Sequence, residues 1–141
     1  MILKTALMCL ALNVYHEAKN QSTVGQLAVG QVVLNRVEDT RFPNTVCEVI
    51  EEGVTYKGTD TPVLHKCQFS WYCDGKPDNP DKSSKAWIKA LINANTVLKN
   101  EIIDITEGAT HYHATYVKPA WAATKTRTTR IDSHIFYRWE K

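Results

Sequence analysis

Glu17 is the residue of this sequence whose position best suits acid–base chemistry. It closes an apolar run, Ile2–Tyr15, and a second apolar segment, residues 25–37, follows a few residues later. A carboxyl group where two apolar helices meet is partly desolvated, and desolvation raises its pKa because it disfavours the charged form. A carboxyl group that stays protonated near neutral pH can serve as a general acid. From position alone, the alternative is a solvated glutamate at a helix end.

Two histidines raise the possibility of a metal site. His111 and His113 are two residues apart in a segment that alternates like a strand, so they share a face. Together with Glu17 they could form a ligand set, but no H-E-x-x-H pair supports it, and the cysteines lack the C-x-x-C spacing of zinc sites. We therefore predict no metal and no cofactor, and we interpret the two histidines as hydrogen-bonding groups in a polar groove.

Aromatic residues gather in segments predicted to be irregular or short-stranded. Aromatic faces beside polar side chains suit a sugar, and they also suit single-stranded nucleic acid. Phe69, Phe136 and Tyr137 are assigned to the core. The remaining aromatic candidates are Trp71, Tyr72, Tyr112, Tyr116 and Trp121.

Apolar periodicity and capping residues predict the elements that position these groups. Thr23 is taken as the N-cap of the second helix, with Gln26 completing a capping box. The predicted helices are Leu3–Ala18, 24–37, Thr45–Glu52 and Lys82–Asn100. Residues 53–80 are expected to be a long irregular segment, and residues 110–117 and 133–139 a two-stranded pair. The prediction is one α+β domain over residues 1–141, mostly helical.

Composition excludes several classes of protein. The chain has 141 residues and a net charge of +2, and it contains no apolar stretch long enough to cross a bilayer, so we predict no stable membrane insertion. Residues 111–141 hold six Lys or Arg and two Asp or Glu, which makes this end basic. Such a patch suits a polyanionic surface, whether nucleic acid, lipid or wall polymer, or is a solvated basic face.

The cysteines and the N-terminus bear on the cellular setting. Cys9, Cys47, Cys67 and Cys73 are compatible with two disulfides or with none, and the sequence does not choose among three pairings. The first twelve residues resemble a short signal peptide, but they carry one charge and no small-x-small cleavage site follows. We therefore predict no signal peptide.

Six short strings follow one another along the chain. They are YHEA at 15–18, AVGQVVLNRV at 28–37, FPNTVCEVI at 42–50, QFSW at 68–71, ATHYHA at 109–114 and HIFY at 134–137. In this order they resemble the SleB/CwlJ-type cell wall hydrolases, which include spore-cortex-lytic enzymes and phage lysins. The resemblance runs from about Ala6 to Arg138.

The resemblance implies a small lysozyme-like domain that cleaves the glycan strand of peptidoglycan, with Glu17 as the catalytic acid. Family members of the spore type are lytic transglycosylases, which break the MurNAc–GlcNAc β-1,4 bond and leave a 1,6-anhydro end. The matching motifs suggest Gln68, Ser70, Trp71, Tyr112 and His113 as substrate-binding residues. The expected partner is the glycan strand, with no nucleic acid, and the protein is expected to be a monomer.

Three alternatives stay open at this point. A hydrolytic muramidase would need a second carboxylate, such as Asp74. A non-catalytic glycan-binding module would merely bury Glu17. A metal-dependent hydrolase would use the histidines. The predicted lack of a signal peptide and of a wall-binding module favours a phage endolysin, made in the host cytoplasm and acting on the cell wall.

Overall fold

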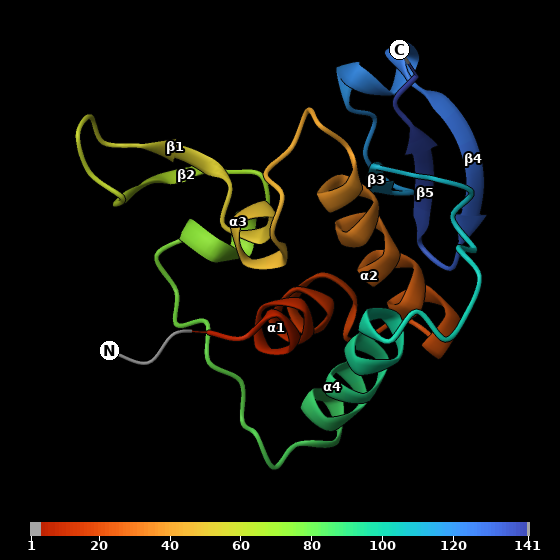
Figure 1. Cartoon of the computed structure of the whole chain (residues 1–141), viewed down its shortest axis with the longest axis horizontal. Coiled ribbons are helices and arrows are strands. Elements are labelled where there is room, and N and C mark those ends of the chain that lie inside the picture. Colours follow the sequence, from red (N-terminus) through yellow and green to blue (C-terminus); the bar gives the residue numbers. More distant parts are fainter. Residues whose placement is uncertain (1–3, 141) are drawn as a thin grey trace.

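Helix α1 (Ala6–Ala18) is the central helix of the fold. The computed structural model describes residues 4–140, so the predicted start at Leu3 lies outside the described residues. Six consecutive residues, 9–14, are buried, and the helix is therefore covered on every side in its middle turns. This confirms the prediction from its all-round apolar sequence. The helices packed against it are α2 (Thr23–Glu38), α3 (Val46–Ile50) and α4 (Lys85–Leu98) (Figure 1).

The start of α2 corrects the predicted cap. Ser22, not Thr23, is the N-cap, and its hydroxyl accepts a hydrogen bond from Gly25 N at 3.2 Å. Gln26 does not reach back to a cap but is fully buried. Its Nε2 donates to Ala18 O at 3.1 Å and its Oε1 accepts from Asn93 Nδ2 at 2.7 Å. Gln26 therefore joins the end of α1 to α4, because a buried amide must find partners.

Two disulfides settle the cysteine pairing. Cys9–Cys47 joins α1 to α3, and Cys67–Cys73 closes a short loop that ends at the 3-10 helix η1 (Ser70–Cys73). The first bridge spans a sequence separation of 38 residues. A link of that length removes about 4 kcal/mol of chain entropy from the unfolded state in the loop-closure treatment. It fixes the helix that carries Glu17 against its neighbour.

The segment predicted to be irregular contains a hairpin. Strand β1 (Gly53–Thr55) pairs antiparallel with β2 (Pro62–Cys67), and the hairpin projects from the body beside α3 (Figure 1). The prediction missed it because all of β1 and half of β2 are exposed, so neither strand has the alternation of apolar and polar residues that marks a half-buried strand.

A three-stranded sheet covers the other side of α2. The predicted antiparallel pair is confirmed as β3 (His111–Ala114) with β5 (His134–Arg138), but β5 pairs on its far side with a third strand, β4 (Thr126–Ile131). The two-stranded prediction was wrong because β4 reads TRTTRI, which is mostly polar and lies at the sheet edge. The predicted α+β class, mostly helical, is confirmed.

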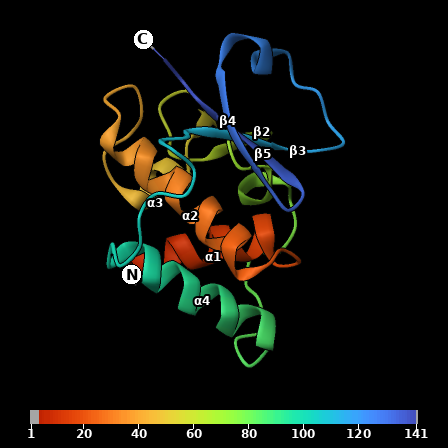
Figure 2. The same cartoon turned by 90° about the vertical axis from the view of Figure 1, so that its right-hand side faces the viewer.

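The sheet and the helices meet in a small second core. Phe136 of β5 is fully buried against Ala28, Val29 and Val32 of α2 and Ala18 at the end of α1. Figure 2 shows the sheet stacked over the ends of α1 and α2. This contact brings the middle of β3 to the last turn of α1. Within residues 4–140, no helix is both long and apolar enough to cross a membrane.

Candidate active site

Glu17 lies in the last turn of α1 and points toward the sheet. Val14, almost one turn earlier, and Ala18, the next residue, are buried, and Glu17 itself is partly buried. The hydroxyl of Tyr112, in the middle of β3, donates a hydrogen bond to Glu17 Oε1. A residue of the first helix and a residue 95 positions later in the chain therefore form one polar contact at the junction of helices and sheet.

The surroundings of Glu17 favour its protonated form. Burial raises the pKa of the carboxyl above its ordinary value of 4.5, while the Tyr112 hydrogen bond and the charge of Arg36 lower it by less. The balance is a carboxyl group that holds its proton to a higher pH than a solvated glutamate does. The alternative of a solvated glutamate at a helix end does not fit this position.

Arg36 of α2 is a buried cation beside this carboxyl group. Its Nε donates to Thr110 O at 2.7 Å, and its guanidinium lies between two rings, 5.0 Å from the centroid of Phe42 and 5.3 Å from that of Phe69. Burial lowers the pKa of Arg36, and the nearby Tyr112, Glu52 and Glu17 raise it. Sequence reasoning quoted Arg36 only as part of a motif. An arginine on an apolar helix face was the available signal, because such a charge needs partners.

A chain of contacts holds the η1 segment against α1. Trp71 Nε1 donates to Asn13 Oδ1 at 2.9 Å, and Asn13 lies one turn before Glu17. The Trp71 ring stacks on His16 with the centroids 4.5 Å apart, and His16 Nε2 donates to Asp78 O at 2.7 Å. Two successive turns of α1 thus hold η1 and the segment at Asp78 against the helix that carries Glu17.

The predicted substrate-binding residues lie in different places. Tyr112 contacts Glu17, whereas Trp71 is 7% exposed and its ring stacks against that of His16. Gln68 and Ser70 are exposed at the start of η1 and are accessible to a ligand.

His113 is not brought to Glu17. It follows Tyr112 in β3, so it lies on the opposite face of the sheet. There, His113 Nδ1 donates to Ala114 O at 2.7 Å, and Nε2 lies 2.8 Å from the Tyr137 hydroxyl. A sugar contact by His113 beside Glu17 does not fit this arrangement.

His134 is a histidine on the Glu17 side that sequence reasoning did not single out. It is opposite Ala114 in the β3–β5 register, and its ring centroid is 5.0 Å from that of Tyr112. Burial lowers the pKa of His134, so the ring is neutral at neutral pH. The predicted strand pairing could have identified it, since residues opposite each other share a face.

Asp74, predicted as a possible second carboxylate, is engaged in a local turn, where its Oδ1 accepts a hydrogen bond from Lys76 N at 2.9 Å. Burial lowers the pKa of His111 to about 4. Across residues 4–140, no three His, Cys, Asp or Glu side chains are grouped so that they could hold a metal ion.

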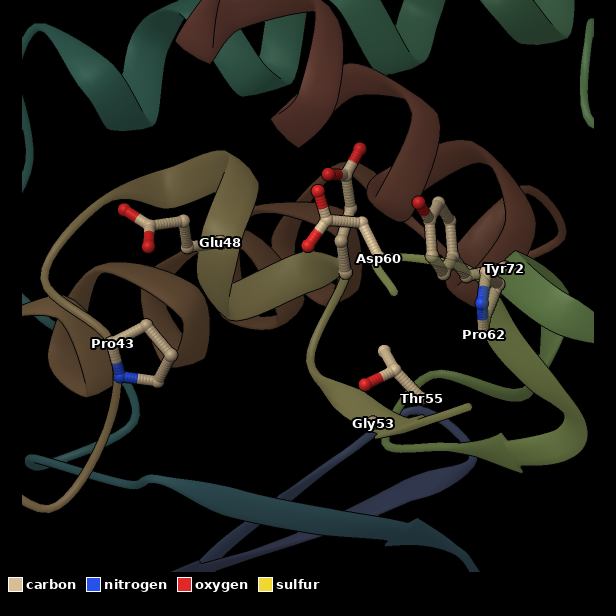
Figure 3. Close-up of a pocket in the computed structure, with 8 residues that line it drawn as sticks. Pro43, Glu48, Gly53, Thr55, Asp60, Pro62 and Tyr72 are labelled. Atoms are coloured by element: carbon tan, nitrogen blue, oxygen red, sulfur yellow. The ribbon is translucent and has the colours of Figure 1, made fainter. Parts of the chain in front are cut away.

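A separate hollow of about 450 Å³ lies between α3, the β1–β2 hairpin and η1 (Figure 3). It does not include Glu17. Its acidic lining residues are Glu48, Glu51 and Asp60, and Tyr72 closes one side. The hollow is therefore distinct from the contact between α1 and β3.

Comparison with known proteins identifies the family. The sequence model of the family described as cell wall hydrolase matches residues 20–137. The chain belongs to the cell wall hydrolase family. The match confirms the resemblance drawn from the six motifs, and it begins three residues after Glu17.

Relatives and solved structures agree with this membership. Spore cortex-lytic enzymes of Halalkalibacterium halodurans and Bacillus cereus are 27% identical over 124 residues, or 87% of this chain. The chain spans only 32% and 40% of their respective lengths. The catalytic domain of the germination-specific lytic transglycosylase SleB from Bacillus anthracis superposes with a TM-score of 0.64 at 25% identity, covering 97% of both chains. The SleB catalytic domain of Bacillus cereus gives 0.63 at 26%, covering 94% of this chain and 89% of that one.

Proposed function

We propose that this chain cleaves the MurNAc–GlcNAc β-1,4 bond of peptidoglycan as a lytic transglycosylase, with Glu17 as its catalytic acid and base. The observation that carries the proposal is the partly buried Glu17, hydrogen-bonded to Tyr112, whose pKa is raised by burial. A carboxyl group that keeps its proton is what cleavage of a glycosidic bond requires first.

The reaction can be written with one carboxyl group. Protonated Glu17 gives its proton to the glycosidic oxygen as the bond from that oxygen to the anomeric carbon breaks. The 6-hydroxyl oxygen of the muramyl residue then bonds to the anomeric carbon, and Glu17, now a carboxylate, accepts the hydroxyl proton. The product is a 1,6-anhydro ring, and Glu17 returns to its starting state. The cycle consumes no water and needs no second carboxylate.

Two neighbours of Glu17 fit the two halves of this cycle. The Tyr112 hydroxyl fixes the position of one carboxylate oxygen, which leaves the other oxygen to carry the proton. Arg36 stabilises the carboxylate formed after the first proton transfer, which burial alone would make costly. Together they keep the pKa of Glu17 between that of a solvated carboxyl and that of an isolated buried one.

The relatives support the reaction class. The Bacillus anthracis protein is described as a germination-specific lytic transglycosylase, and the curated relatives are described as spore cortex-lytic enzymes. Sugar contacts by the exposed Gln68 and Ser70 belong to the same proposal. Trp71 is buried against His16, so it supports this segment and is not proposed as a sugar contact. The endolysin role, the origin in a host cytoplasm and the monomeric state remain predictions.

Substitution of Glu17 tests the proposal. Glu17→Gln keeps the shape of the side chain but cannot donate the proton, so clearing of permeabilised bacterial cells should slow by about 10²–10⁴-fold. Glu38→Gln, at an exposed position of α2, is the matched control and should clear like the parent. Equal clearing by the parent and Glu17→Gln would contradict a catalytic role and favour a binding module.

The products test the mechanism separately. Mass spectrometry of peptidoglycan digested by the parent protein should show muramyl ends that are lighter by one water than reducing ends. Reducing ends in their place would show that water attacks, as in a hydrolytic muramidase, and the single-carboxylate cycle would then be wrong. Cleavage should be unchanged in chelator, whereas loss of cleavage would favour a metal-dependent hydrolase.

A further inference from the structure

The outer face of the three-stranded sheet, turned away from Glu17, carries a regular array of side chains. Antiparallel residues opposite each other share a face, so the strand registers define the array. It consists of two cross-strand rows, His111–Tyr137–Arg127 and His113–Ile135–Arg130. One edge of this face is therefore made of histidines and the other of arginines.

The histidine edge is covered and the arginine edge is open. Trp121, from the 3-10 helix η2 (Ala120–Thr124), packs over three of these rings, with centroids 5.1 Å from His111, 5.7 Å from His113 and 5.2 Å from Tyr137. Arg127 and Arg130 are exposed on β4, which forms the right-hand edge of the molecule in Figure 1. The partly exposed Trp121 therefore packs on Tyr137, whose cross-strand neighbour on β4 is the exposed Arg127.

The acidic groups that could neutralise this edge are engaged elsewhere. Residues 111–141 contain two acids, Asp132 and Glu140. Asp132 Oδ2 accepts from Ser22 N at 2.9 Å and from Ser22 Oγ at 2.6 Å, while Glu140 pairs with Arg138 at 2.9 Å. Arg130 Nε donates a hydrogen bond to Asp132 O at 3.2 Å, but within the described part of the chain neither Arg127 nor Arg130 forms an ion pair.

A third cation, Lys125, directly precedes β4, is partly exposed, and has its Nζ 4.8 Å from the ring centroid of Trp139. Exposed arginines present planar donors that match phosphate oxygens in pairs. The partly exposed ring of Trp121 offers a flat surface to a sugar or polyol carbon chain. The chemistry of this edge therefore fits a polymer that alternates phosphates with hydroxylated carbons.

We propose that this surface, made of Arg127, Arg130, Lys125 and Trp121, binds a phosphate-bearing polymer of the bacterial cell wall. The choice of a wall polymer rests on the proposed function, which places the protein at the wall. Because Tyr112 and the arginines lie on opposite faces of the sheet, the polymer would hold the enzyme at the wall without contacting Glu17. The surface keeps the enzyme near its substrate between cleavage events.

Cosedimentation with purified cell walls tests this surface. All proteins carry Glu17→Gln, so that the walls stay intact during the measurement. The parent should sediment with walls that retain their phosphate polymers and be released at about 0.5 M NaCl, because salt screens such contacts. It should bind at least about tenfold more weakly to walls from which phosphate polymers were removed by acid, since hydrogen bonds between charged groups contribute this much.

A matched pair of double variants locates the binding. Arg127→Gln/Arg130→Gln should weaken binding at least about tenfold, and Lys76→Gln/Lys82→Gln, which removes the same charge from exposed positions elsewhere, should change it less than about twofold. Binding that does not depend on the arginines or on wall phosphate would overturn the proposal. Competition by duplex DNA as effective as competition by the isolated wall polymer would also overturn it, in favour of a nucleic acid surface.

The failure of this surface is distinguishable from the failure of the proposed function. Protein with Glu17 intact is assayed for cleavage of phosphate-free peptidoglycan, where Arg127→Gln/Arg130→Gln should match the parent. Loss of wall binding with cleavage retained would isolate the surface. Wall binding by the parent without any cleavage would contradict the proposed function alone.

Discussion

The two faces of the three-stranded sheet place similar side chains in opposite situations. Tyr112 and Tyr137 lie on neighbouring strands, and each hydroxyl contacts one titratable side chain. On the inner face, Tyr112 donates to a partly buried carboxyl group whose charged form is disfavoured. On the outer face, Tyr137 contacts His113, whose other ring nitrogen is satisfied by a backbone oxygen.

The comparison shows that the inner face holds a titratable group, Glu17, whose charged form is disfavoured by burial. On the outer face, each ring nitrogen of His113 has a hydrogen-bond partner. On the inner face, burial and the partners of Glu17 act in opposite directions on its pKa. A buried carboxyl group whose pKa is raised is suited to donate a proton, and we therefore expect the inner face to be the reactive one.

Removal of the inner hydroxyl should have the larger effect. Tyr112→Phe keeps the ring but loses the hydrogen bond that favours the carboxylate, so the pKa of Glu17 should rise further. The alkaline fall of kcat/KM, where Glu17 loses its proton, should move to higher pH. The rate at the optimum should drop about 10–100-fold because the carboxyl group is no longer fixed, corresponding to roughly 1.4–3 kcal/mol. A pH profile of glycan cleavage measures both, and an unmoved alkaline limb would contradict the assigned hydrogen bond.

Glu17→Gln should also stabilise the fold at neutral pH. Because the pKa of Glu17 is raised in the folded state, its favourable contribution is complete below the ordinary value of 4.5 and is lost as pH rises through the folded pKa. Glutamine has no proton to lose, so the variant should melt about 3 °C above the parent at pH 7, which corresponds to ~1 kcal/mol for a domain of this size.

Calorimetry at two pH values checks this expectation. At pH 4 the advantage should shrink, because both side chains are then uncharged in the folded state. A variant that melts below the parent at pH 7 would mean that the Glu17 carboxylate stabilises the fold, against the direction of its pKa.

The sequence was sufficient for features that one segment encodes by itself. The all-round apolar character of residues 3–18 predicted a central helix, and the position of Glu17 at its end predicted a desolvated carboxyl group. The alternation in 110–117 and 133–139 predicted a strand pair that the structure confirms. Each of these depends on local periodicity, which burial imposes directly.

Features that depend on a distant partner could not be predicted from the sequence. The guanidinium of Arg36 is held by a carbonyl 74 positions away, and only the fold supplies that contact. Strand β4 was missed because its pairing, not its composition, makes it a strand. His113 was grouped with Tyr112 because their motif is continuous, whereas alternation along β3 sends them to opposite faces.

The outer tyrosine supplies the matched control and the smallest expected effect. Tyr137→Phe removes one hydroxyl, as Tyr112→Phe does, but its partner is His113 on the face turned away from Glu17. The free energy of unfolding should fall by about 1 kcal/mol, the usual value of one hydrogen bond. Glycan cleavage should stay within about twofold of the parent, with its pH profile unchanged. If Tyr137→Phe instead slowed cleavage as much as Tyr112→Phe, the outer face would take part in the reaction, and substrate binding by His113 would regain its support.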